Sequence, residues 1–206
     1  MGKPIPQEQI TGLLLAGGLG TRMGHLDKGL QALDDSTLAG VVLKRIKPQV
    51  NTVLINANRN LSIYAQFGYP VLPDDIPGHA GPLAGLHAGL QHCKTPYLLS
   101  VPCDTPAFPN DLAQRLAFAL TLAAADLAFA VTGEHSQPTR HPVFCLLKTS
   151  LLPSLDSYLR GGGRRVADWL LQQPHAQAHF EDQSAFMNIN TPEDLQAFTS
   201  QPRPWA

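Results

Sequence analysis

The clearest pattern in the sequence is an alternation of short, continuous apolar runs with longer segments of helical periodicity. The apolar runs predict buried strands. These strands are Thr11–Leu15, Thr52–Asn56, Pro70–Leu72, Tyr97–Val101, Leu127–Val131 and Pro142–Leu147. Apolar positions three and four residues apart predict helices. The helices are Leu38–Ile46, Asn60–Phe67, Pro82–Cys93, Asn110–Ala124, Ser150–Arg160, Arg164–Gln172 and a last one that begins at Thr191.

This order of elements predicts an α/β fold. Strands that read as continuous apolar runs are covered on both faces, and strands that alternate with helices form parallel sheets. We therefore expect a mostly parallel, doubly wound (Rossmann-like) sheet with helices on both faces. A chain of 206 residues suits one domain, so residues 1–206 are expected to form a single unit.

Two helix starts carry capping signals. Asn110 or Asp111 is expected to cap the helix that follows. In the segment from Thr191 to Asp194, Thr191 stands at the cap, Pro192 fits the first turn, and Asp194 occupies the acidic position of a capping box. The first nine residues are polar and are expected to fray.

Polar residues follow three of the predicted strands abruptly. These segments are Leu15–Gly18, Asn56–Arg59 and Pro102–Asp104. Ligands of parallel sheets bind at the carboxyl ends of the strands, so we expect the three segments to meet at one edge.

The segment after the first strand, AGGLGTRMGHLDKG, has many glycines and two cations, Arg22 and Lys28. Glycines let backbone N–H groups approach phosphate oxygens closely. The segment lacks the Gly-Lys-Ser/Thr of a P-loop, and its glycines miss the Rossmann spacing. It predicts a phosphate-binding loop, with a plain surface turn as the alternative.

Charge and composition narrow the function. Fifteen lysines and arginines against sixteen aspartates and glutamates give a net charge of -1, so nothing favours nucleic acid or an anionic membrane as partner. Three widely spaced cysteines (Cys93, Cys103 and Cys145) fit a reducing compartment. Because no apolar run has the length of a signal peptide or a membrane span, we expect a cytoplasmic protein without membrane contact.

Short motifs recur in a fixed order along nearly the whole chain. They are LAGG from Leu15, RMG from Arg22, DKG from Asp27, NANR from Asn56, GPLAG from Gly81, PCDTP from Pro102, HP from His141, GRR from Gly163 and NINTPEDL from Asn188. In this ordered set the chain resembles the molybdenum cofactor guanylyltransferase family, within the nucleotidyltransferase superfamily. The order and coverage of the motifs make the resemblance specific.

The resemblance implies a reaction and a set of residues. The family joins GMP from GTP to the terminal phosphate of molybdenum-bearing molybdopterin and releases pyrophosphate. GTP contacts map onto Leu15, Ala16, Gly17, Gly18, Lys28, Asn56 and Asp74, with Gly81 and Gly85 beside the guanine or ribose, and the Mg²⁺ ligand maps onto Asp104. Residues 10–110 would bind the NTP, and residues 111–200 the acceptor.

The expected chemistry needs charge neutralisation more than proton transfer, because the nucleophile is already a phosphate anion. Lys28 and magnesium held by Asp104 would neutralise the reacting phosphates, and Arg22 would help the loop to close. Each assignment has a structural alternative. Asp104 could be a cap or turn residue, Asn56 could end a strand, and the Gly81–Gly85 segment could be an ordinary helix start.

The acceptor side is expected to use Arg164, Asn188 and Asn190, with Arg140 and Arg165 on the solvated surface. The two asparagines would share one face of a short strand. In the family, the NxNTP element contributes to the pterin side. Transient contact with proteins that supply molybdenum cofactor and with molybdoenzymes is a further expectation.

Three other functions stay open. A cytidylyltransferase acting on the same pterin would depart from LAGG and GPLAG, which this chain keeps. A sugar-1-phosphate nucleotidyltransferase would share the first loop but usually has a longer chain. A non-catalytic nucleotide-binding module would be expected to lack Lys28 or Asp104.

Overall fold

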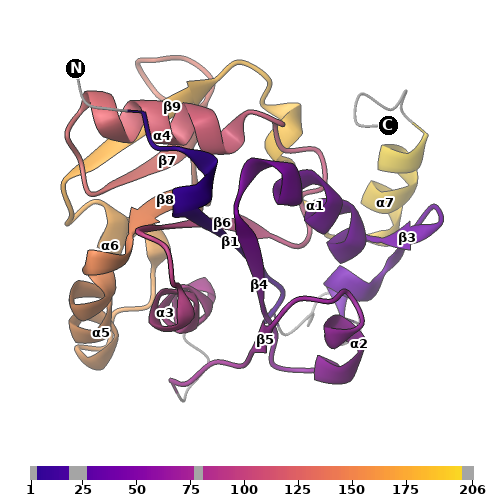
Figure 1. Ribbon diagram of the computed structural model, residues 1–206. Coiled ribbons are helices and arrows are strands. Elements are labelled where there is room, and N and C mark those ends of the chain that lie inside the picture. The colour runs from indigo at the N-terminus through magenta and orange to yellow at the C-terminus, as the bar shows by residue number, and fades with distance from the viewer. Residues whose placement is uncertain (1–3, 19–26, 77–80, 201–206) are drawn as a thin grey trace.

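The computed structural model describes residues 4–18, 27–76 and 81–200, and its centre is a seven-stranded sheet (Figure 1). The strand order is β5-β4-β1-β6-β8-β7-β9. The strands are β1 (Ile10–Leu15), β4 (Thr52–Asn56), β5 (Val71–Leu72), β6 (Tyr97–Pro102), β7 (Leu127–Thr132), β8 (Thr139–Lys148) and β9 (His175–Phe180). The α-helices are α1 (Leu38–Ile46), α2 (Leu61–Ala65), α3 (Pro82–His92), α4 (Leu112–Leu122), α5 (Leu152–Arg160), α6 (Val166–Leu170) and α7 (Pro192–Thr199).

The sheet is mostly parallel, which confirms the predicted fold class. β1 pairs in parallel with β4 and β6, β4 with β5, and β7 with β9. β8 alone runs the other way, antiparallel to both β6 and β7. The chain builds outward from β1 through β4 to β5 and then returns to the other side of β1 as β6. This reversal of strand order marks the place where such sheets bind ligands.

Helices cover both faces of the sheet. Leu14 of β1 lies in one buried cluster with residues of α1, α2 and α4, while Leu13 and Leu15 lie in a second cluster with residues of α3, α5 and α6. Successive side chains of a strand point to opposite faces, so the continuous apolar run of β1 serves two cores at once. None of the described helices is long and apolar enough to cross a membrane.

Three of the strands were not predicted from the sequence. A two-stranded antiparallel hairpin, β2 (Ala32–Leu33) with β3 (Ser36–Thr37), precedes α1. β9 was also missed, because its sequence HAQAHF alternates small apolar residues with histidine and glutamine and has no continuous apolar run. β8 begins three residues earlier than predicted.

Three local expectations differ from the structure in whole or in part. Asn188 and Asn190 lie in an irregular segment between a 3-10 turn (Ser184–Phe186) and α7, so no strand aligns their side chains. Asp111 occupies the cap position of α4, but its side chain makes no capping hydrogen bond. The capping box of α7 is confirmed, with Thr191 and Asp194 bonded reciprocally. Residues 7–9, expected to fray, form a 3-10 turn, and the Gln7 side chain bonds to the Val50 carbonyl.

A small third cluster joins the hairpin to the C-terminal helix. Leu33, Leu38 and Ile189 are buried together, and Leu195 and Phe198 of α7 pack against them. α7 has no buried residue of its own. The helix therefore packs on the surface of this cluster, in which Leu33 and Leu38 come shortly after the segment that carries Lys28 in the sequence.

Candidate active site

The carboxyl ends of β4, β1 and β6 are tied together by backbone hydrogen bonds. The Ala16 N–H donates to the Asn56 carbonyl at 2.8 Å, and the Cys103 N–H donates to the Leu15 carbonyl at 3.0 Å. The three polar segments predicted to meet at one edge are therefore held side by side.

The start of the glycine loop is closely bordered by asparagine side chains. A Cβ atom on Gly17 would lie 2.9 Å from Asn58 Nδ2 and 3.1 Å from Asn56 Oδ1, whereas one on Gly18 would meet nothing within 4 Å. Arg59 donates to the Gly18 carbonyl at 3.2 Å. Glycine at position 17 is thus required by the asparagines behind the loop. Arg22 lies outside the described residues.

The Asp74 carboxylate accepts hydrogen bonds from two asparagine side chains. Asn56, only 2% exposed, donates through Nδ2 to Asp74 Oδ1 at 2.8 Å and to the Leu72 carbonyl at 3.1 Å. Asn58 Nδ2 donates to Asp74 Oδ2 at 2.8 Å, and the Asp74 N–H donates back to Asn58 Oδ1 at 2.8 Å. The sequence placed Asn56 and Asp74 in one site, and the structure adds Asn58 between them.

Two glycines lie at the start of α3, and one of them, Gly85, packs against Asn56. A Cβ atom on Gly85 would come within 2.3 Å of Asn56 Oδ1 and 2.5 Å of Leu15 Cδ2. Gly81, at the N-cap of α3, has φ +61° and ψ -149°, a backbone conformation that other residues rarely adopt. Both glycines thus have a structural requirement at this edge of the sheet.

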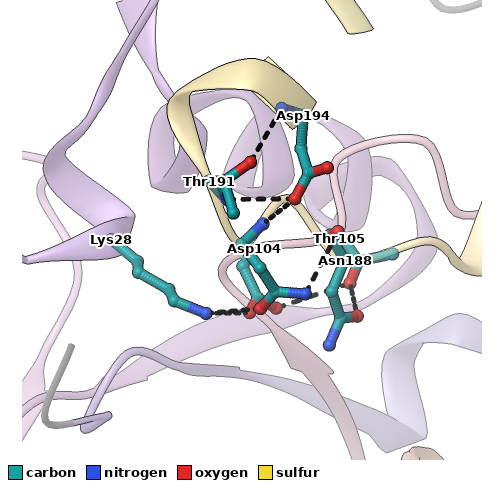
Figure 2. Close-up of polar contacts among 7 residues, drawn as sticks. Lys28, Asp104, Thr105, Asn188, Thr191 and Asp194 are labelled. Carbon is teal, nitrogen blue, oxygen red and sulfur yellow. Dashed lines mark hydrogen bonds and ion pairs between the residues drawn. The ribbon is translucent and has the colours of Figure 1, made fainter. Parts of the chain in front are cut away.

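The Lys28 ammonium group contacts two oxygen acceptors from distant parts of the chain (Figure 2). Its Nζ donates to Asn190 Oδ1 at 2.7 Å and forms an ion pair with Asp104 Oδ2 at 3.3 Å. The side chains of Lys28 and Asp104 are 22% and 14% exposed, so water screens the pair only in part. Lys28 belongs to a 3-10 turn (Lys28–Leu30) directly before the hairpin.

The segment after Asn188 also holds the turn that carries Asp104. The Ile189 N–H donates to the Asp104 carbonyl at 2.8 Å, and the Thr105 hydroxyl donates to Asn188 Oδ1 at 2.7 Å. Asp104 therefore does not cap a helix: it lies in a turn whose backbone is fixed by the C-terminal segment.

Comparison with known proteins identifies the family. The chain matches the MobA-like NTP transferase domain family over residues 12–177. The chain belongs to this family.

Proteins that are similar to this chain in sequence or in fold agree with its place among the MobA-like NTP transferases. The chain is 50% identical over 196 residues to a molybdenum cofactor guanylyltransferase of Ralstonia nicotianae, covering 93% of this chain and 96% of that protein. It is 50% identical over 192 residues to a protein of the same name from Bordetella petrii, covering 93% and 98%. In fold, it is similar to molybdopterin-guanine dinucleotide biosynthesis protein A of Archaeoglobus fulgidus, with a TM-score of 0.74, 21% identity and coverage of 91% and 95%.

Two residues that hold the turn before Lys28 in this NTP transferase were not predicted from the sequence. The carboxylate of Asp27, next to Lys28, accepts from the Tyr64 hydroxyl at 2.7 Å and from Asn60 Nδ2 at 3.0 Å. Burial, more than any other cause, raises the pKa of Tyr64 far above its ordinary value, so the hydroxyl keeps the proton that it donates. A tyrosine on a short helical segment resembles any core residue, so no local signal marks this one.

Arg164 is not joined to the Lys28 cluster. Its guanidinium donates to the Leu159 carbonyl at 3.0 Å and to the Gly163 carbonyl at 2.7 Å, at the end of α5. In Figure 1, α5 lies well apart from α7, beside which Asn188 and Asn190 are found. The structure thus brings the two asparagines, but not this arginine, to Asp104.

No thiol in the site is poised for chemistry. Cys103 precedes Asp104 and is buried, and burial, with the Asp104 charge second, raises the pKa of its thiol well above the ordinary value. It serves as a small apolar side chain, as the sequence indicated. Among the described residues, no group of three or more His, Cys, Asp or Glu side chains could enclose a metal ion.

Proposed function

We propose that this chain transfers GMP from GTP to the terminal phosphate of molybdopterin carrying molybdenum, forming molybdopterin guanine dinucleotide cofactor and releasing pyrophosphate. The observation that carries the proposal is the convergence of Lys28 and Asp104 beside the glycine loop. The names of relatives 50% identical over nearly the whole chain support the same reaction.

The nucleotide would bind along the edge formed by the glycine loop and α3. Gly17 and Gly18 carry no side chain, and a Cβ atom on Gly18 would meet nothing within 4 Å, which suits close approach by phosphate oxygens. The Asn56–Asp74 pair supplies a fixed carboxylate and an amide oxygen, which suit the hydroxyl and N–H donors of a nucleoside. Gly81 and Gly85 keep the adjoining face of α3 free of side chains. Each group matches one part of a nucleoside triphosphate.

The donor set at Asp104 fits Mg²⁺. Magnesium is bound in proteins by one or two carboxylates together with phosphate oxygens and water, so a cluster of acidic ligands is not required. Asp104 offers a partly exposed carboxylate that already holds the cationic Lys28 ammonium group. We propose that Asp104 holds the ion, which would stabilise negative charge on the phosphates.

The residues of the chain would supply position and positive charge. The acceptor phosphate is deprotonated at neutral pH, so no general base is needed. Lys28 would neutralise charge on the α-phosphate and on the leaving pyrophosphate, and Arg22 would help to hold the loop over them. Asp27, fixed by Tyr64 and Asn60, sets the turn from which Lys28 extends.

The acceptor is proposed to bind on the side of residues 111–200, with the NTP on the side of residues 10–110. Asn188 and Asn190 border Asp104 and Lys28, which supports a place for them between the two substrates. Arg164 would have to release the carbonyls that it now bonds. The role of Arg164 in acceptor binding stays a prediction. Transient contacts with molybdenum cofactor-supplying proteins and molybdoenzymes, and a cytoplasmic location, also stay predictions.

Ligand-induced thermal stabilisation tests which nucleotide the protein binds best. With Mg²⁺ present, we expect GTP to raise the melting temperature more than CTP, UTP or ATP. A ligand at 100 times its Kd stabilises the folded state by about 2.7 kcal/mol. Pyrophosphate release that requires both GTP and molybdenum-bearing molybdopterin would complete the test. An equal or larger shift with CTP would refute the guanylyl assignment and leave the transferase class standing.

A further inference from the structure

The capping box of α7 has one bond more than helix capping requires. The Asp194 N–H donates to Thr191 Oγ1 at 3.1 Å, and the Thr191 N–H donates to Asp194 Oδ2 at 3.0 Å, which completes the box. The same Oδ2 atom also accepts from the Asn190 N–H at 2.9 Å. This third bond lies outside the helix and fixes the backbone of Asn190.

Asn190, held in this way, in turn binds the Lys28 side chain. Its Oδ1 atom accepts from Lys28 Nζ at 2.7 Å, between residues separated by 162 positions in the sequence. Its neighbour Ile189 is 3% exposed and donates its N–H to the Asp104 carbonyl. One short segment therefore sets the position of both charged groups of the site.

Within the described part of the chain, α7 is only partly buried. None of its residues is buried, and it meets the rest of the chain through the partly buried Leu195 and Phe198. Its N-terminal turn is thus the part with a direct link to the site. The bond from the Asn190 backbone, the largest cause, lowers the pKa of Asp194, so the carboxylate is charged at neutral pH.

We propose that Asp194 is a positioning residue, which fixes Asn190 so that Asn190 holds the Lys28 ammonium group beside Asp104. The inference rests on the proposed role of Lys28 in phosphate transfer. Asp194 itself would contact neither substrate. It acts on the rate because a charged group displaced by about 1 Å can cost a hundredfold in turnover.

The variant Asp194→Ala tests the proposal, with Glu193→Ala as the matched control. Both acids stand in the first turn of α7 and interact with the helix dipole, but the bonds to Asn190 and Thr191 belong to Asp194. At saturating GTP and molybdopterin, we expect Asp194→Ala to lower kcat by about tenfold or more. Glu193→Ala should stay within about twofold of the parent protein.

A double-mutant cycle with Lys28→Ala separates positioning from general stability. If Asp194 acts through Lys28, adding Asp194→Ala to Lys28→Ala should lower kcat little further, because coupled residues are not additive. Equal losses in both backgrounds would show that Asp194 only supports the fold. If the alanine variant folds poorly, Asp194→Asn can replace it in the test. Asparagine keeps the side-chain volume and one acceptor oxygen but loses the negative charge that strengthens both bonds, so it should also lower kcat.

Acylation of lysine side chains gives a readout that is independent of catalysis. Mass spectrometry after brief treatment with acetic anhydride should show faster modification of Lys28 in Asp194→Ala than in Glu193→Ala. Equal modification, with equal kcat, would overturn the inference. A Lys28→Ala protein of full activity would instead overturn the role of Lys28 in the proposed function, so the two failures are distinguishable.

Discussion

Replacing Gly85 by alanine tests whether the face of α3 shapes the nucleotide site. The new Cβ would lie 2.3 Å from Asn56 Oδ1 and 2.5 Å from Leu15 Cδ2, so Asn56 must move. Asn56 is 2% exposed and holds Asp74 at 2.8 Å, so its displacement disturbs that bond. We therefore expect the variant to fold but to bind GTP weakly.

Gly89, one turn further along α3, provides a matched control. A Cβ atom there would meet Leu13 Cδ2 at 2.5 Å and Leu98 Cδ2 at 3.1 Å, which are apolar atoms within the sheet. In either position, alanine gains up to about 1 kcal/mol of helix propensity, and overpacking costs about 1–3 kcal/mol. Both variants should therefore lose about 0–2 kcal/mol of stability.

Binding should separate the two variants. A hydrogen bond to a charged group contributes about 1.5–3 kcal/mol, and each 1.4 kcal/mol is a factor of about ten in Kd. Isothermal titration with GTP and Mg²⁺ should give a Kd at least about tenfold higher for Gly85→Ala than for Gly89→Ala, and urea unfolding supplies the stabilities. Equal Kd values in two folded variants would refute the placement of GTP against Asn56 and α3.

Two further substitutions test the charged pair. Lys28→Ala should lower kcat by about a hundredfold. Because it leaves the partly buried Asp104 carboxylate without its cation, it should also cost about 1–3 kcal/mol in urea unfolding; a fully active Lys28→Ala protein would contradict this role. Asp104→Asn keeps the side-chain volume and should abolish magnesium-dependent guanylyl transfer, because it removes the charge that a hard divalent ion needs. Unchanged transfer by Asp104→Asn at limiting Mg²⁺ would make Asp104 structural.

The sequence alone determined the parts that depend on local pattern. Continuous apolar runs indicated doubly covered strands, and the glycine loop with Lys28 indicated a phosphate site. The capping box at Thr191 and Asp194 was equally clear, because its residues lie three positions apart and bond within one turn. The order of the motifs gave the family, which the match over residues 12–177 confirms.

Only the tertiary structure decided how distant segments meet. β9 and the β2–β3 hairpin lack a local signal, since one alternates small apolar with polar residues and the other has strands of two residues. Asn190 was expected to share a strand face with Asn188, yet its partner is Lys28. That contact joins residues 162 positions apart, and it depends on the packing of α7 against the hairpin, which no periodicity in the sequence records.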